Sequence, residues 1–156
     1  MKNIETTYTT SDIARLNIKR ERLKVWMEKG WIKPSVQVAK GAGTKNLFNR
    51  LDLYIILLFK QLVEHGFTGE EAHSRIGWAN YSNGEAITKV FGEDEYVVFF
   101  KGNFPDNQAK PQLYTFSTKN KSNNLVEFLN FYLPSLETAI VINFLKVKEQ
   151  VDNLTA

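Results

Sequence analysis

The sequence predicts an α+β protein, with a mostly helical N-terminal half and a small C-terminal module of about three strands and two helices. Helical spacing of apolar residues and helix-capping side chains dominate as far as residue 78. Beyond that residue, β-branched and aromatic runs alternate with turn-rich segments, which is typical of short strands. We therefore divide the chain of 156 residues into domains 1–78 and 79–156.

Two short helices joined by a tight turn are expected near the N-terminus. Thr10-Ser11-Asp12 can cap the first helix, over about 11–16, and Asn17 suits the turn because it tolerates left-handed backbone angles. The second helix covers about 19–29, and Gly30 is expected to end it. Because this second helix begins in basic residues, the pair has a helix-turn-helix pattern.

The remainder of the first domain is expected to hold a hairpin and two more helices. Residues 36–48 predict a small hairpin with a flexible, basic tip that contains two glycines. Asn49 can cap a long, strongly apolar helix that ends at Gly66, and such a helix must be buried over much of its surface. Thr68 can cap a further helix, with acidic side chains in its first turn.

The second domain is expected to combine short strands with two helices. Alternating or β-branched runs predict strands over Glu95–Lys101, Gln112–Ser117 and Ala139–Phe144. Helical spacing predicts helices over Asn124–Leu133 and Leu145–Leu154. The many aromatic residues here are expected to form core, although they could also line a pocket or an interface between subunits.

Positive charge is concentrated in the first half of the chain. As far as residue 75 there are 13 Lys or Arg residues against 8 acidic ones, whereas the remainder holds 7 against 9. All five arginines lie in the first part. This asymmetry suggests that the first half is a module that binds nucleic acid and that the second half has another role. Charge alone fits equally well with chance clustering of basic residues on a solvated face.

Four segments in order and spacing carry a resemblance to a known family. They are YTTSDIARL, LKVWMEKGWIKP, GTKNLFNRLDL and LVEHGFTGEEA, and all four lie within residues 8–77. This part of the chain resembles the DNA-binding domain of the MerR family of bacterial transcription regulators. The resemblance implies a winged helix-turn-helix, in which 19–29 is the recognition helix and 36–48 the wing. It also implies that promoter DNA is bent and untwisted, and that RNA polymerase is a partner.

The chain departs from the family pattern at several points. Val25 stands where relatives often carry an aromatic residue that contacts phosphate, and Phe48 replaces a tyrosine. The turn at Asn17 lacks the usual glycine and is one residue short. Many relatives continue into a long dimerising coiled coil, whereas no heptad repeat is sustained here after Trp78.

The candidate DNA-binding residues are basic or lie at helix starts. Arginine can read guanine bidentately, and lysine more often contacts phosphate. Each candidate also has an interpretation without DNA. The recognition helix could be a solvated face with ion pairs to Glu21 and Glu28, and the wing could be a mobile surface hairpin. Trp26 could be a packing residue. The set consists of Lys19, Arg20, Arg22, Lys24 and Trp26 on the recognition helix, Lys40 and Lys45 on the wing, and Asn49 and Arg50 at the start of the next helix.

The expected function is that of a sequence-specific, DNA-binding transcriptional regulator that acts as a dimer on double-stranded DNA. The alternative is an architectural, excisionase-like or chromosome-organising protein without direct promoter regulation. With no coiled coil evident, we expect pairing through Val147, Val151 and Leu154 together with the strand AIVINF, and a folded, monomeric fragment 1–78.

Several functions have no support in the sequence. The chain has no cysteine and only two histidines, His65 and His73, so no metal site is expected. No nucleophile–base set is legible, so we expect no enzyme and no cofactor. A polar N-terminus and short apolar runs favour a cytoplasmic protein without membrane contact. A small-molecule effector stays open.

Overall fold

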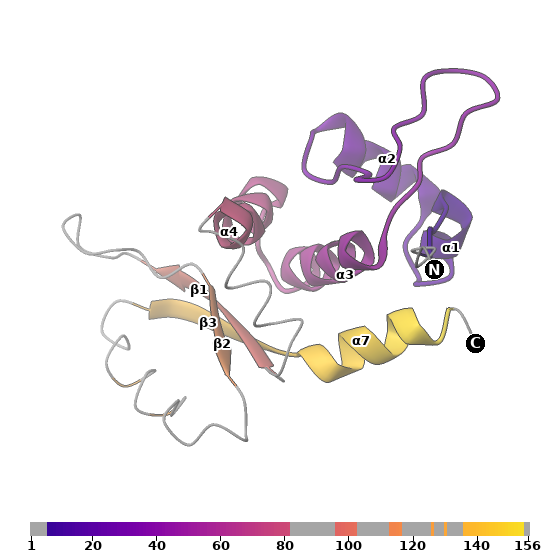
Figure 1. Ribbon diagram of the computed structural model, residues 1–156. Helices are drawn as coiled ribbons and strands as arrows, with labels where there is room; N and C mark the ends of the chain where they lie inside the picture. The colour runs from indigo at the N-terminus through magenta and orange to yellow at the C-terminus, as the bar shows by residue number, and fades with distance from the viewer. Residues whose placement is uncertain are drawn as a thin grey trace. The chain divides into compact units, whose positions relative to one another are not determined.

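The computed structural model describes residues 6–81, 96–102, 113–116, 126, 130 and 136–154 (Figure 1). These residues contain five helices and a three-stranded antiparallel sheet, so the α+β class is confirmed. Contacts divide the chain into two compact units, residues 1–73 with 146–156 and residues 74–145. We call the first unit the head and describe each unit by itself. Among the described helices, none is both long and apolar enough to cross a membrane.

The head begins with two short helices, α1 (Thr10–Ala14) and α2 (Arg20–Glu28). Thr9, one residue before the expected cap, caps α1 and shares a reciprocal capping box with Asp12. Asn17 in the connecting turn has φ of 65°, so the left-handed turn predicted from its side chain is confirmed. Gly30 ends α2 with φ of 75°, which a glycine adopts without strain.

Helix α3 (Arg50–Glu64) is the central buried helix of the head. Eight of its 15 residues are buried, as its apolar sequence predicts. The expected cap at Asn49 is confirmed: its side-chain oxygen accepts a hydrogen bond from the backbone N–H of Asp52 at 2.8 Å. Gly66 follows the helix with φ of 97°, again as expected. The ring of Phe59 from α3 meets the ring of Trp26 edge-on, with centroids 4.8 Å apart.

Helix α4 (Gly69–Tyr81) begins at the expected cap. The Thr68 hydroxyl accepts from the N–H of Glu71 at 3.1 Å, and the Glu71 carboxylate accepts from the N–H of Thr68 at 2.8 Å. Gly69 lies against the ring of Trp31 so closely that a Cβ there would overlap the ring atoms. The absence of a side chain at Gly69 therefore lets the start of α4 pack on Trp31.

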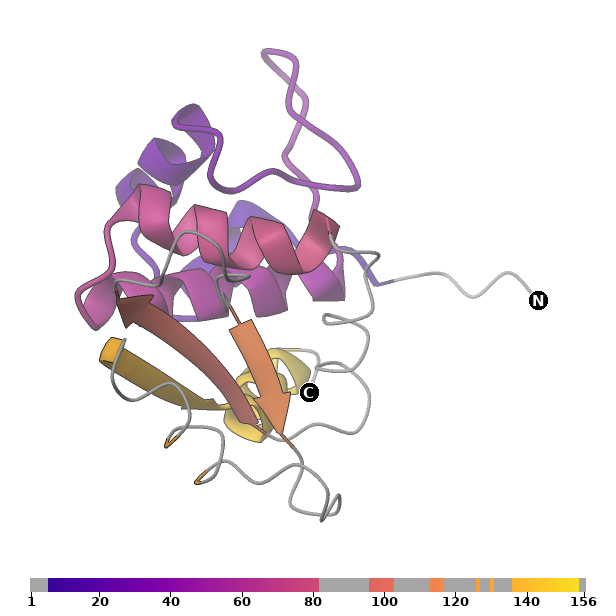
Figure 2. The same ribbon diagram turned by 90° about the vertical axis from the view of Figure 1, so that its left-hand side faces the viewer.

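The second unit contains the sheet, whose strands are β1 (Tyr96–Gly102), β2 (Leu113–Phe116) and β3 (Leu136–Asn143). Strand β1 lies between β2 and β3, and both pairings are antiparallel (Figure 2). Val97 and Phe99 of β1 are fully buried, and their partners on β3 are Ile142 and Ile140. The helix expected over 124–133 lies outside the described residues, apart from positions 126 and 130, which are helical.

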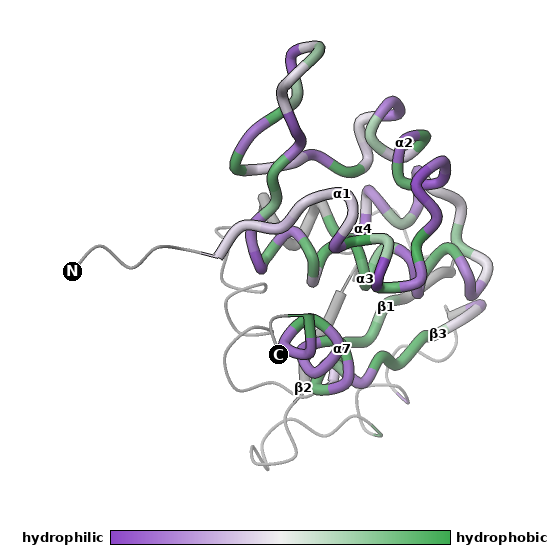
Figure 3. The backbone as a smooth tube through the Cα atoms, turned by 90° about the vertical axis from the view of Figure 1, so that its right-hand side faces the viewer, coloured by the Kyte–Doolittle hydropathy of each residue, from purple (hydrophilic) through white to green (hydrophobic). Residues whose placement is uncertain are grey.

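The final helix, α7 (Phe144–Asp152), follows β3 without a break and carries both hydrophobic and hydrophilic residues (Figure 3). Its last part, from residue 146, belongs to the head. The division expected at residue 78 is therefore incomplete, because it assigned this helix to the second domain. Capping residues and the spacing of apolar residues predict a helix from its own sequence. They do not show which distant part of the chain packs against the apolar face of that helix.

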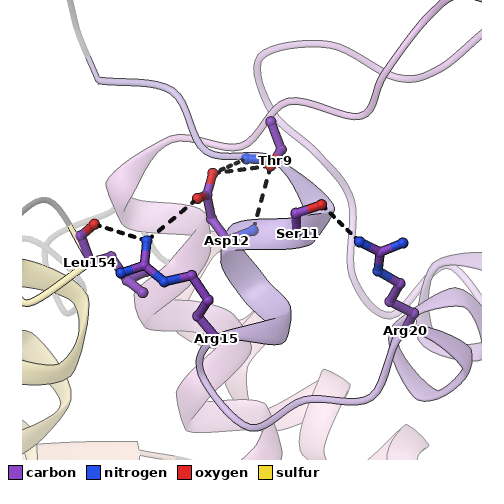
Figure 4. Close-up of polar contacts among 6 residues, drawn as sticks. All are labelled: Thr9, Ser11, Asp12, Arg15, Arg20 and Leu154. Atoms are coloured by element: carbon purple, nitrogen blue, oxygen red, sulfur yellow. Dashed lines mark hydrogen bonds and ion pairs between the residues drawn. The ribbon is translucent and has the colours of Figure 1, made fainter.

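Two contacts within the head hold the end of the chain. The Arg15 guanidinium donates to the carbonyl of Leu154 at 3.3 Å and also lies 4.0 Å from Asp12 (Figure 4). Arg50 pairs with Asp152 at 3.4 Å. Val147 and Val151 of α7 are 3% and 0% exposed, and Leu154 is half-buried. The expected dimerisation stripe is therefore wrong as a free surface, because the chain's own fold covers its two valines.

Candidate nucleic-acid interface

Helix α2 presents a polar face to solvent and an apolar face to the core. Leu23 and Trp26 are buried. The exposed positions recur at intervals of about four residues, which places them on one side of the helix. This exposed face consists of Arg20, Glu21, Lys24, Val25 and Glu28. It is the part of the predicted recognition helix that a duplex could reach.

The first residues of α2 combine positive charge with free helix N–H groups. Lys19 is the N-cap residue, and none of the described side chains caps the helix there. The Arg20 guanidinium donates to the Ser11 hydroxyl at 2.8 Å, which joins the start of α2 to α1 (Figure 4). The helix dipole and the two cations both favour an anion at this end.

Arg22 contacts two other residues of the head, although its side chain is 38% exposed. Its guanidinium lies 5.0 Å from the centre of the Trp26 ring and 3.6 Å from the Glu64 carboxylate at the end of α3. A cation over an indole face is attracted to it, so these contacts hold Arg22 against the head. Arg20 and Lys24 have contacts of their own, with Ser11 and Glu28, so base reading stays a prediction for all three residues.

Trp26 is a core residue. Its side chain is only 4% exposed and packs on Phe59. Its carbonyl accepts from the N–H of Trp31 at 3.0 Å and closes the end of α2. Packing is therefore the role that the structure shows for Trp26, and a hydrogen bond from its indole N–H to phosphate stays a prediction.

The predicted wing is a hairpin-like loop held by both backbone and side-chain hydrogen bonds. One isolated antiparallel bridge joins Gln37 to Leu47, without a regular pair of strands. Nearer the tip, the Asn46 side-chain oxygen accepts from the N–H of Ala39, and the Thr44 hydroxyl accepts from the N–H of Lys40, at 2.8 and 2.7 Å. These bonds give the loop a defined shape with both of its lysines exposed, Lys40 and Lys45.

Asn49 and Arg50 are occupied by structural contacts. The Asn49 side chain caps α3, as described above. Arg50 faces Asp152, and the Tyr8 hydroxyl beside it is the main cause of its raised pKa, with burial acting in the opposite direction. Burial raises the pKa of the neighbouring Tyr54, and the charge of Asp152 adds to the effect. The structure therefore places Arg50 beside α7.

Five lysines of the head are exposed and form no ion pair with the residues that the structure describes: Lys19, Lys29, Lys33, Lys40 and Lys45. By contrast, Lys24 lies 3.8 Å from Glu28. Two of these five, Lys29 and Lys33, lie outside the set predicted from the sequence. Both lysines lie in the segment that follows α2 and leads into the wing. Their position between the two predicted DNA-contacting elements could have identified them from the sequence.

Metal chemistry has no structural support within the described ranges. Among residues 6–81, 96–102, 113–116 and 136–154, no three histidine or acidic side chains come together in a way that could hold an ion. His65 follows α3 and its Nδ1 lies 2.7 Å from the carbonyl of Gln61. That contact closes the end of the helix.

No protein-family model matches this sequence, and no curated protein matches it.

Proposed function

We propose that the chain is a sequence-specific, DNA-binding transcriptional regulator of the MerR-like type, with α2 as its recognition helix and residues 36–48 as its wing. One observation carries the proposal: α1 and α2, joined by a tight turn, belong to the same unit as a loop with two exposed lysines, and α2 carries Arg20 and Lys24 on its exposed face. In this arrangement Arg20 and Lys24 read the major groove, and the lysines of the wing meet phosphates of the same duplex.

The proposal includes a dimer, because a single head covers only one half-site. The buried valines of α7 leave β3 as the remaining candidate of the two elements named from the sequence. Val141 on β3 is 48% exposed. RNA polymerase is a further partner by family resemblance, and bending of promoter DNA is the mechanism that the resemblance favours.

The first test is selection of duplexes from a random pool with the intact chain, followed by affinity measurements. We expect one enriched motif, bound about 10³-fold or more tightly than random duplex at physiological salt. Lys24→Ala should cost about 1–3 kcal/mol on that motif and relax discrimination at one base pair. Lys146→Ala, which removes an exposed lysine that pairs with an acid of its own helix on α7, is the matched control. An equal loss on random duplex would reassign Lys24 to phosphate contact.

Lys45→Ala tests the wing. If Lys45 meets a phosphate, its removal should weaken binding to every duplex and reduce the slope of log K against log salt by about 0.9. The readout is fluorescence anisotropy over a series of salt concentrations. A slope equal to that of the wild type would remove the wing tip from the interface.

The alternative function is an architectural or excisionase-like protein that binds DNA without regulating a promoter directly. The same exposed lysines support it, because phosphate contacts alone give binding without sequence preference. Footprinting separates the two: protection of one short operator beside a promoter favours regulation, and protection that spreads along the duplex favours the architectural role.

A further inference from the structure

A polar hollow of about 530 Å³ lies in the head where the turn after α1, helix α3 and the end of α7 meet. Its walls come from parts of the chain that are far apart in the sequence, and all of them belong to the head. Among the described residues that line it, two carry positive charge, three carry side-chain amides and none is acidic. The polar lining consists of Arg15 and Asn17 from the turn, Lys60 from α3, and Gln150 and Asn153 from the end of the chain.

Lys60 brings to this hollow an ammonium group that is poorly hydrated and incompletely neutralised. Its side chain is only 17% exposed, and its ion pair with Glu64 has a separation of 3.9 Å, which is longer than a hydrogen bond. Glu64 also lies 3.6 Å from Arg22, so one carboxylate serves two cations. A cation held away from water in this way favours a second anion beside it.

Arg15 supplies the second positive charge. Its guanidinium donates to the carbonyl of Leu154 at 3.3 Å and lies 4.0 Å from the Asp12 carboxylate (Figure 4). The other oxygen of Asp12 accepts from the N–H of Thr9 at 2.7 Å, so this acid mainly caps α1. The guanidinium offers further N–H donors in a planar fork, which matches the oxygens of a carboxylate or a phosphate.

We propose that this hollow binds a small anion with two or more negative charges, a polycarboxylate or a phosphate compound, through Arg15 and Lys60. The exposed amides of Asn17, Gln150 and Asn153 donate to its remaining oxygens. The anion neutralises cations from two elements of the head and joins both of them to α7, so it stabilises the docking of α7. This site is independent of the proposed function, because neither its chemistry nor its test requires DNA.

The probes are inorganic pyrophosphate and citrate, added to the intact chain while sodium chloride keeps the ionic strength constant. We expect at least one of them to raise the thermal midpoint by about 4 °C or more, with a saturable dependence on concentration. General exclusion of such anions from protein surfaces would raise the midpoint without saturation. A response to pyrophosphate alone identifies a phosphate compound as the ligand, and a response to citrate alone identifies a polycarboxylate.

Two variants place the binding in the hollow. Lys60→Gln removes a charged contact, and Gln150→Glu adds a negative charge at an exposed position that folding does not need. Each should weaken binding of the probe, measured by calorimetric titration, by about tenfold or more. The matched control is Lys146→Gln, which changes the net charge by the same amount on α7 but outside the hollow, and should bind like the wild type. If Lys60→Gln fails to fold, Gln150→Glu carries the test.

Two results would overturn the site. One is the absence of a saturable response to both probes, and the other is an equal affinity of Gln150→Glu and Lys146→Gln for the probe. Duplex DNA is another source of phosphate, so the salt slope of duplex binding is also measured; a slope reduced by about 0.9 in Lys60→Gln would assign the hollow to DNA and overturn the small anion. A wild-type chain that binds pyrophosphate or citrate but no duplex would overturn the proposed function and leave this site standing.

Discussion

Replacement of Asp52 by alanine is expected to destabilise the head by about 3 kcal/mol, because one carboxylate holds both ends of the wing. Its Oδ2 accepts from the N–H of Ser35 at 3.0 Å, from the Ser35 hydroxyl at 2.6 Å and from the N–H of Asn49 at 3.0 Å. Asp52 is only 9% exposed, so its loss leaves these donors unsatisfied in a poorly hydrated place.

The measurement is urea denaturation of the intact chain, followed by tryptophan fluorescence. Asp52→Asn keeps the shape but loses the charge, and should give an intermediate midpoint. Glu70→Ala, which removes an exposed carboxylate from the first turn of α4, is the control and should change stability by about 0.5 kcal/mol or less. An Asp52→Ala midpoint equal to that of the control would show that the wing is not anchored in this way.

Val151→Asp is expected to have an even larger effect, of about 4 kcal/mol or more, because it places an unpaired charge at a fully buried position of α7. Gln150→Asp introduces the same side chain at the neighbouring exposed position and should leave stability nearly unchanged. Denaturation and light scattering of both variants provide the comparison.

The same pair of variants decides what the apolar face of α7 does. If Val151 belonged to a free dimerisation stripe, Val151→Asp would give a folded monomer with a wild-type midpoint. Because Val151 is buried within the head, we instead expect Val151→Asp to unfold the head. It also replaces our expectation for the fragment 1–78, which lacks α7 and therefore exposes the part of the head that this helix covers.

Local chemistry allowed several features of the fold to be predicted from the sequence. Asn17 and Gly30 take left-handed backbone angles for reasons that belong to their own side chains, and Asn49 caps α3 through a residue three positions away. Each of these features depends on neighbours in the chain, so a sequence pattern can specify it.

Features that depend on distant partners were not predictable. Trp26 and Arg22 were named as interface residues because of their position on a basic helix, and the sequence could not show that Phe59 and Glu64 of α3 contact them. The Arg15–Leu154 contact joins residues 139 positions apart. Helical spacing showed that α7 has an apolar face, but the same spacing suits a dimer interface and an intramolecular core equally well.

The most direct test of the central claim is to map where the intact protein occupies the DNA of its own cells, with Lys24→Ala/Lys45→Ala as the comparison. The proposed function predicts a small number of discrete sites next to promoters, sharing one motif, and their loss in the double variant. Continuous coverage without a shared motif, or occupancy that the double variant retains in full, would contradict it.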